Sequence, residues 1–437
     1  MKKRILFFGA FVAVICSYAQ EKNCATPSDF GTTYVTKGGS VRIPVTINNT
    51  GSNIIKSIGY VITRDGVESG QKSASTGNIA VGESGQVNIV FQADSEARKS
   101  RQTITITKVN STANTSEEKS ATGSIVTILE KPKVVPVVEE FTGTWCGWCP
   151  IGFDGMERAH ETFGDKAALI AIHYSDPMQV SDFSDIVGRA SSFPSALIGR
   201  GAESFYPSAS ELKKQINQEI QNKVAPASMQ VSAEWTSATQ RIIKIVTKTK
   251  FVYSDDNANL AIAYALTEDG MTGTESNWAQ SNYLSGNSNY ASSLPFWYKA
   301  SSNVFVEFNH VGVAAWEIAN GIDGSVNPVV QAGDVQEYTY KANIGSNTLI
   351  QDKSRLKVIA MLIDRDSGTI VNAAQTTITD YATGVQGLTT DGNTTSHHGG
   401  EIYDLNGRRV GNGQLKMDNG QLKPGIYIVN GKKVMVK

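Results

Sequence analysis

Two cysteines separated by two residues carry the clearest chemistry in this sequence. Cys146 and Cys149 stand in the run Trp-Cys-Gly-Trp-Cys-Pro, between a β-branched stretch at 134–138 and an apolar spacing that predicts a helix from Pro150. Backbone N–H groups at a helix N-terminus favour a thiolate over a thiol. We therefore predict that Cys146 is the exposed nucleophile and that Cys149, one turn further on, is the buried resolving thiol that closes a disulfide with it.

This stretch resembles the thioredoxin family, and the resemblance rests on three features. These are the Trp-Cys-x-x-Cys motif after a strand, an acidic residue six positions before the first cysteine, and a later proline. The resemblance implies that Glu140 lies beneath the disulfide and relays a proton to the resolving cysteine. It also implies that Pro194 is cis and faces the disulfide. Gly147-Trp148 replaces the Gly-Pro of cytosolic thioredoxins, and this dipeptide tunes the redox potential.

Two other interpretations of the cysteine pair have to be weighed. A structural zinc site needs two more ligands, and the nearest histidines, His160 and His173, show no paired ligand spacing. We therefore predict no metal and no cofactor. The second alternative is a structural disulfide on a thioredoxin-like scaffold without activity, since a fold does not fix a function. It stays open.

The N-terminal segment predicts export. Lys2-Lys3-Arg4 precedes an apolar run that is too short to span a membrane, and Ser17 and Ala19 suit cleavage before Gln20. We predict a signal peptide at 1–19; a lipoprotein anchored at Cys16 is disfavoured because Ile15 is bulky. Export places the cysteine pair in a compartment where disulfides persist. Cleavage would remove Cys16, so that Cys24 is the third and unpaired cysteine of the mature protein.

The composition argues against a nucleic-acid-binding protein. The chain has 437 residues and a net charge of −1, with no basic stripe that would suggest nucleic-acid binding.

The pattern of the next residues predicts two domains. Alternating apolar residues and Gly, Asn and Asp turns at 25–130 predict an immunoglobulin-like β-sandwich that serves as a spacer or binding module. We place a thioredoxin-like α/β domain at 134–223, with the order strand, helix, strand, helix, strand, strand, helix.

Period-two alternation returns at 224–380 and predicts a second β-sandwich. A long insertion in it, 278–299, is rich in aromatic residues among Asn, Ser and Gly. Such side chains can bind sugar or peptide, or they can pack over the sandwich, and we favour packing. The aromatic residues are Trp278, Tyr283, Tyr290, Phe296, Trp297 and Tyr298.

Two further resemblances concern the cellular location of the protein. Residues 134–377 resemble the 28-kilodalton outer membrane protein family of Bacteroidota, on the Cys-x-x-Cys motif, Leu266–Gly270, Asn309-His310-Val311 and Asp364–Ala373. After a polar linker at 384–400, residues 401–437 resemble the C-terminal sorting domain of type IX secretion and imply a small β-sandwich. These resemblances imply an outer-membrane, cell-surface or secreted protein that is recognised by the type IX machinery.

The sequence therefore predicts an exported, multidomain protein whose thioredoxin-like domain performs thiol–disulfide exchange. Its expected partners are protein thiols and disulfides, together with a possible surface ligand of a β-sandwich. The candidate site consists of Cys146, Cys149, Glu140 and Pro194. The alternative is a non-catalytic surface adhesin or binding protein in which the disulfide is structural.

Overall fold

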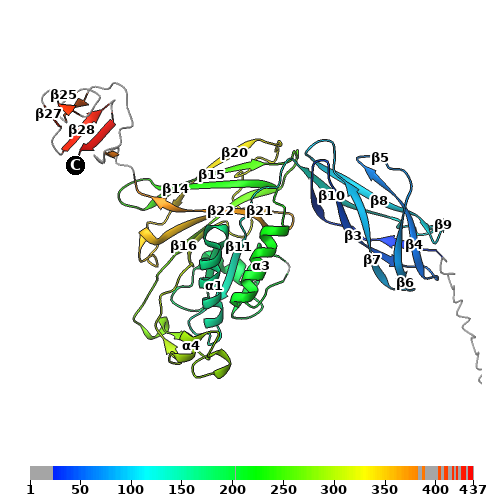
Figure 1. Ribbon diagram of the computed structural model, residues 1–437, viewed down its shortest axis with the longest axis horizontal. Coiled ribbons are helices and arrows are strands. Elements are labelled where there is room, and N and C mark those ends of the chain that lie inside the picture. Colours follow the sequence, from blue (N-terminus) through cyan, green and yellow to red (C-terminus); the bar gives the residue numbers. More distant parts are fainter. Residues whose placement is uncertain are drawn as a thin grey trace, which may run out of the picture.

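The computed structural model describes residues 23–201 and 203–381, followed by short segments at 386–388, 402–404, 408–411, 416–417, 420–421, 425–429 and 432–436. It is a β-rich structure built from several sheets (Figure 1). The predicted signal peptide, 1–19, lies outside the described residues. Within them, no helix is both long enough and apolar enough to pass through a bilayer.

The N-terminal region is a pair of sheets around one core. A three-stranded sheet has the order β1-β3-β7, and a larger sheet has the order β2-β10-β8-β4-β5 with β6 and β9 on its sides. The alternating apolar residues of both sheets meet in one cluster that includes Ile47, Ile89 and Ile104. The strands are β1 (Ala25–Pro27), β2 (Thr32–Thr36), β3 (Ser40–Asn49), β4 (Ile55–Arg64), β5 (Val67–Glu68), β6 (Lys72–Ile79), β7 (Ser84–Gln92), β8 (Lys99–Val109), β9 (Thr112–Ala113) and β10 (Ser120–Ile128).

The central region is organised by one ten-stranded sheet of order β13-β11-β12-β19-β16-β21-β22-β14-β15-β20. The first three strands carry the cysteine motif, and β19 joins them to the rest by pairing parallel to β12 at Ala171 and Val311. The strands are β11 (Val137–Thr142), β12 (Ala168–His173), β13 (Ser195–Ile198), β14 (Ala227–Trp235), β15 (Ile242–Phe251), β16 (Leu260–Glu268), β19 (Val311–Trp316), β20 (Val335–Asn343), β21 (Leu356–Asp364) and β22 (Thr369–Thr379).

Two helices lie side by side over one face of this sheet near β11: α1 (Pro150–Phe163) and α3 (Ala209–Asn222) (Figure 1). Helix α1 begins with a proline at its first position, and α3 is capped by Ser208, whose side chain accepts a hydrogen bond from the Glu211 backbone. Their apolar stripes meet Val138 and Leu169 in one buried cluster. This packing fixes the start of α1 above the end of β11.

Shorter elements complete the chain. Helix α2 (Ser184–Val187) packs through Ile186 into the buried cluster that contains Val137 and Phe141 of β11. Helix α4 (Pro295–Lys299) lies in the insertion after β16, together with the two-stranded β17 (Gln280–Ser281) and β18 (Asn303–Val304). The short 3-10 turns are η1 (Gly164–Lys166), η2 (Ser181–Phe183), η3 (Ser276–Trp278), η4 (Ser288–Tyr290) and η5 (Lys353–Arg355). The C-terminal strands are β23 (Gln386–Leu388), β24 (Ile402–Tyr403), β25 (Arg409–Gly411), β26 (Lys416–Met417), β27 (Gly420–Gln421), β28 (Gly425–Val429) and β29 (Lys432–Val436).

The structure differs from the sequence expectation in three places. The strands of 224–380 extend the sheet of 134–223, whereas the sequence suggested a separate second sandwich. The expected fourth strand before α3 is reduced to one bridge between Ala196 and Phe205. In the range expected to be a linker, β23 pairs with β29 of the small C-terminal sheet. Alternation identifies strands, but it does not identify their partners; the domain boundaries stay predictions.

Candidate active site

The two cysteines form a disulfide at the start of α1, with their Cα atoms 5.4 Å apart. Cys149 is the N-cap of the helix, and Cys146 lies one turn before it. Cys149 is fully buried and Cys146 is 5% exposed. Cys146 is therefore almost as buried as Cys149, whereas the sequence predicted an exposed Cys146; its role as the nucleophile stays a prediction.

Glu140 lies on β11 beneath α1. The side chain is buried, and its Oε1 atom has no hydrogen-bond partner. Gly152 makes room for it, because a Cβ on that residue would lie 2.3 Å from Oε1. Burial disfavours the carboxylate and raises the pKa of Glu140 to about 8, more than the Thr142 side chain lowers it. A carboxyl group with this pKa can take up or give a proton near neutral pH.

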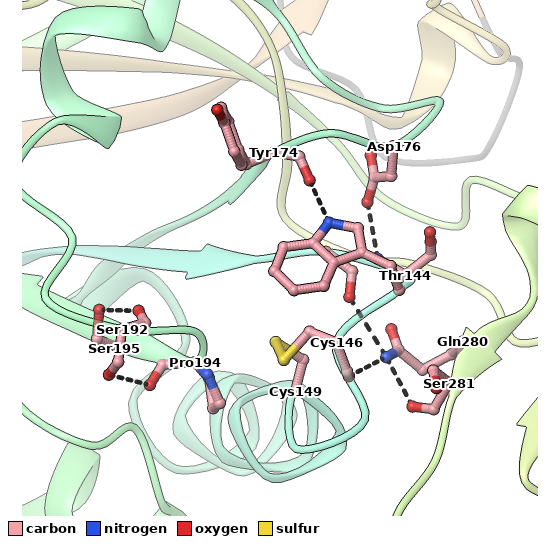
Figure 2. The surroundings of a disulfide bond; sticks show 12 residues. Thr144, Cys146, Cys149, Tyr174, Asp176, Ser192, Pro194, Ser195, Gln280 and Ser281 are labelled. Atoms are coloured by element: carbon pink, nitrogen blue, oxygen red, sulfur yellow. Dashed lines mark hydrogen bonds between the residues drawn. A yellow bond between two sulfur atoms is a disulfide. The ribbon is translucent and has the colours of Figure 1, made fainter.

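A loop after β12 holds one side of the cysteine motif. The Thr144 backbone N–H donates to Asp176 at 2.9 Å, and Asp176 is held in turn by the His173 ring at 2.6 Å. The indole N–H of Trp145 donates to the carbonyl of Tyr174 at 2.7 Å. Figure 2 shows this side of the site, with Tyr174 and Asp176 above the motif. These contacts fix the loop that leads into Cys146.

The insertion after β16 holds the opposite side of the motif. The Gln280 side chain donates to the Cys146 carbonyl at 2.9 Å and to the Gly143 carbonyl at 3.4 Å (Figure 2). The Tyr283 backbone donates to Gly147, and its ring lies so close that a Cβ on Gly147 would meet it at 2.4 Å. We call Gln280, Ser281 and Tyr283 the collar. The Ser281 backbone N–H also donates to the Thr144 carbonyl, so the collar holds the motif through its main-chain carbonyls.

The aromatic residues of the insertion pack mainly against the redox segment, which corrects the expectation that they pack over the sandwich. Trp297 joins Ile151 of α1 in a small apolar cluster and meets Phe153 edge to face at 5.3 Å. Trp148, between the two cysteines, meets Tyr283 at 5.8 Å. Trp278 alone of the expected set contacts the large core of the central region. Sequence alternation could not reveal this, because the contacts join distant parts of the chain.

Pro194 immediately precedes β13 and lies across the disulfide from Gln280 in the view of Figure 2. The Phe193–Pro194 peptide bond is cis, which the family resemblance implied. Phe193 also contacts the Trp145 ring, with centroids 5.4 Å apart. All four residues of the sequence-predicted site therefore gather around the start of α1. Their catalytic roles remain predictions.

An open cavity of about 530 Å³ lies beside the exposed face of Trp145. Its walls come from the motif, from the loop after β12 and from the insertion, and they are rich in hydroxyl and amide groups. The lining residues include Thr144, Trp145, Asp176, Gln179, Asn277 and Ser281. Such a wall can hydrogen-bond the main chain of a bound polypeptide.

Metal ligands are not gathered in this site. Across the part of the chain that the structure describes, no three His, Cys, Asp or Glu side chains are placed to hold a metal ion. His160 packs against the His310 ring with centroids 5.0 Å apart, and His173 bonds to Asp176. Both cysteine sulfurs are engaged in the disulfide.

Comparisons with known proteins show a similarity over a short segment of the chain. No family model matches the chain. Thioredoxin X, a chloroplast protein of Arabidopsis thaliana, is 36% identical over 58 residues, which are 13% of this chain and 31% of that protein. The chain thus spans about a third of the length of that curated relative. This match shows a short thioredoxin-like similarity.

Two solved structures from Porphyromonas gingivalis are similar in outline. HBP35 has a TM-score of 0.44 and 15% identity, over 70% of this chain and 99% of that chain. A domain of the outer membrane lipoprotein Omp28 has a TM-score of 0.19 and 15% identity, over 36% of this chain and 90% of that chain. At these TM-scores neither likeness supports a conclusion about this chain.

Proposed function

We propose that this protein performs thiol–disulfide exchange on polypeptide substrates through Cys146 and Cys149. The observation that carries the proposal is the buried Glu140 carboxyl beneath a disulfide at a helix start. Cys149 is fully buried, so it cannot exchange its proton directly with solvent. Glu140 supplies an acid–base group in the protein interior, with a pKa of about 8.

In the reducing direction, the Cys146 thiolate attacks a substrate disulfide, and one substrate sulfur leaves as a thiolate. Cys149 then passes its proton to the Glu140 carboxylate and attacks the Cys146 sulfur. The second substrate sulfur leaves, and the Cys146–Cys149 disulfide forms. Two electrons pass from the cysteine pair to the substrate. The same steps in reverse oxidise a substrate dithiol, and no cofactor is needed.

The surroundings of the disulfide favour a polypeptide substrate. Trp145 and Trp148 are 49% and 41% exposed on either side of Cys146, and they offer apolar surface to a bound chain. The polar cavity beside Trp145 offers hydrogen bonds to its backbone. We propose that a flexible segment enters from this open side, because the collar closes the other. Pro194 would then contact the substrate chain next to the disulfide.

One observation favours the alternative of a non-catalytic surface adhesin or binding protein with a structural disulfide. Cys146 is only 5% exposed, and the collar hydrogen bonds hold the motif in place. In that case the exposed Trp145 and Trp148 would form the binding surface, and the disulfide would only stabilise the loop that carries them. Activity of the purified protein distinguishes the two functions.

The test is insulin reduction by the purified full chain. We expect wild-type activity and its complete loss in Cys146→Ser, because the attacking sulfur is removed. Cys149→Ser should accumulate a mixed disulfide with the substrate. Cys24→Ser removes a buried free thiol elsewhere and should keep wild-type activity. A wild-type protein that neither reduces nor oxidises insulin or reduced ribonuclease would leave the binding protein as the better account.

We further propose that the protein is exported and displayed at the outer membrane or cell surface. The support is the N-terminal segment and the sequence resemblance of 401–437 to a type IX sorting domain. Deleting 401–437 should leave exchange activity in vitro intact and cause the protein to accumulate in the periplasm of its host. Fractionation and surface labelling measure this outcome. Surface display of the truncated protein would contradict the proposal.

A further inference from the structure

Glu140 faces a small internal cavity that the exchange reaction leaves unexplained. The cavity has a volume of about 20 Å³, enough for one water molecule. Its lining includes polar groups from four parts of the chain: Glu140 on β11, Glu157 on α1, His173 on β12 and Asn309 before β19. A proton that Cys149 gives to Glu140 has to leave the protein, and Glu140 itself lines this cavity.

Glu157 connects the cavity with the surface. It is half-buried, so it reaches both the cavity and solvent. Its Oε1 atom accepts a hydrogen bond from the Asn309 side chain at 2.8 Å. Burial raises the pKa of Glu157, while the Asn309 hydrogen bond and the His160 charge act against this. Glu157 is therefore a second carboxyl group that can exchange protons next to Glu140.

Asn309 is held in place by one of the motifs that the sequence analysis singled out. Its Oδ1 atom accepts from the Gly270 backbone at 2.7 Å, and the neighbouring His310 N–H donates to Asp269 at 2.8 Å. Lys357 pairs with Asp269 at 2.9 Å. The motifs at 266–270 and 309–311 thus meet beneath α1, although they lie far from the cysteines in the sequence.

We propose that Glu157 carries the proton between Glu140 and solvent through a water molecule in this cavity, and that Asn309 is a positioning residue for it. The proposal deepens the proposed function and rests on it. During resolution, the Cys149 S–H proton moves to Glu140, then to the water, then to Glu157 and into bulk solvent. In the reverse reaction the proton follows the same route inwards, and no other reactant is required.

The charged and titratable neighbours of Glu157 come from every element around it. His160 and Glu161 lie on α1 itself, and Glu140 and His173 face the cavity from the sheet. Asp269 comes from the end of β16. Burial lowers the pKa of His310 to about 4, so its contact with Asp269 at neutral pH involves a neutral ring. We therefore expect the carboxyl groups, and not His310, to carry the proton at pH 7.

The experiment is stopped-flow reduction of the Cys146–Cys149 disulfide in the full chain by dithiothreitol, from pH 5.5 to 9. The signal is the fluorescence of the flanking tryptophans. A dithiothreitol thiolate attacks Cys146, Cys149 leaves and takes its proton from Glu140, and the reagent finally cyclises to its own disulfide. In Glu157→Gln the side chain still accepts from Asn309 but cannot titrate. We expect reduction near pH 7 to slow by about 10- to 100-fold, with a larger solvent isotope effect.

The matched control is Asp165→Asn, an exposed carboxylate just beyond the end of the same helix, which should leave the rate and its pH profile unchanged. Glu157→Asp keeps a titrating group and should recover part of the rate. Asn309→Ala should slow the wild type but cause no further loss in Glu157→Gln, because it acts through Glu157. Circular dichroism establishes that each variant is folded.

Two outcomes would overturn the relay. One is a Glu157→Gln rate and isotope effect equal to wild type at every pH; the other is an equal loss in Asp165→Asn. The proposed function is judged separately by insulin reduction. If the wild type fails to act on insulin yet shows the Glu157 effect with dithiothreitol, the proton route stands and the proposed activity falls.

Discussion

Two neighbouring glutamates on β11 face opposite sides of the same sheet and have opposite surroundings. Both are buried. Glu139 receives hydrogen bonds from Arg200 through Nε at 3.0 Å and Nη2 at 2.7 Å, and Arg200 also donates to the Ile318 carbonyl. Glu140 faces α1 on the other side, with one oxygen lacking any partner. The same residue type at the same depth is therefore fully paired on one face and poorly paired on the other.

This difference separates a structural carboxylate from a chemical one. A buried carboxylate that is matched by a guanidinium ties two segments of the chain together. A buried carboxyl group without a counter-charge binds its proton more tightly, which destabilises the ionised protein and makes the group useful for proton transfer. Burial alone does not identify a functional residue; the pairing of its polar atoms does.

The largest effect should come from breaking the paired side. Glu139→Gln leaves the Arg200 charge buried without its counter-charge, and we expect a loss of about 3–5 kcal/mol in the free energy of unfolding. Urea denaturation at pH 7 measures it. Replacing both partners, Glu139→Gln with Arg200→Met, should lose less than the single variant. An unchanged urea midpoint for Glu139→Gln would show that the pair contributes little.

A smaller effect of opposite sign is expected on the unpaired side. The folded-state pKa of Glu140 is raised from 4.5 to about 8. The stabilisation from holding a neutral carboxyl group is complete below pH 4.5 and is lost as pH rises through 8. The side chain of Glu140→Gln cannot ionise. At pH 8 the free energy of unfolding of this variant should therefore be higher than that of the wild type, by on the order of a few kcal/mol.

Thermal denaturation from pH 4 to 9 tests this expectation. The wild-type melting temperature should fall between about pH 4.5 and 8 and level off above that range, while that of Glu140→Gln stays flatter. Glu161→Gln, which removes an exposed carboxylate, should follow the wild type. Parallel wild-type and Glu140→Gln curves would mean that Glu140 has an ordinary pKa.

The local part of the site can be predicted from the sequence. The cysteine spacing, Pro150 and the preceding apolar run place the disulfide at a helix start, and Ser208 with Glu211 marks the start of α3. Glu139 and Glu140 are adjacent identical residues, so the sequence alone does not say which one is paired. Only the fold places Arg200 opposite Glu139.

The remaining part of the site depends on long-range pairing. Gln280 contacts the Cys146 carbonyl across 134 positions, and Asn309 contacts Glu157 across 152. Both contacts exist because β19 pairs with β12, and alternating apolar residues carry no record of which strands pair. For the same reason the sequence predicted a separate second sandwich, whereas the structure has one extended sheet.

The smallest effect tests the close approach on the Glu140 side. Gly152→Ala places a Cβ 2.3 Å from Glu140 Oε1, and we expect a loss of about 1–3 kcal/mol from overpacking. Combining it with Glu140→Ala should restore part of the loss, because the clashing carboxyl group is removed. Gly201→Ala meets only a carbonyl oxygen at 3.5 Å and serves as the control. Equal urea midpoints for Gly152→Ala and the wild type would contradict this packing.

The pairing of β12 with β19 also sets an order in time. When the ribosome has made the cysteine motif and β13, the edge of β12 is still without its neighbour, and an unpaired edge invites association with other chains. Its neighbour, together with Gln280 and Asn309, is synthesised much later. We therefore expect a nascent chain that ends before Gln280 to hold its cysteines without their collar. The disulfide would gain its collar and the proposed proton route through Glu157 only after β19 has been synthesised and has paired with β12.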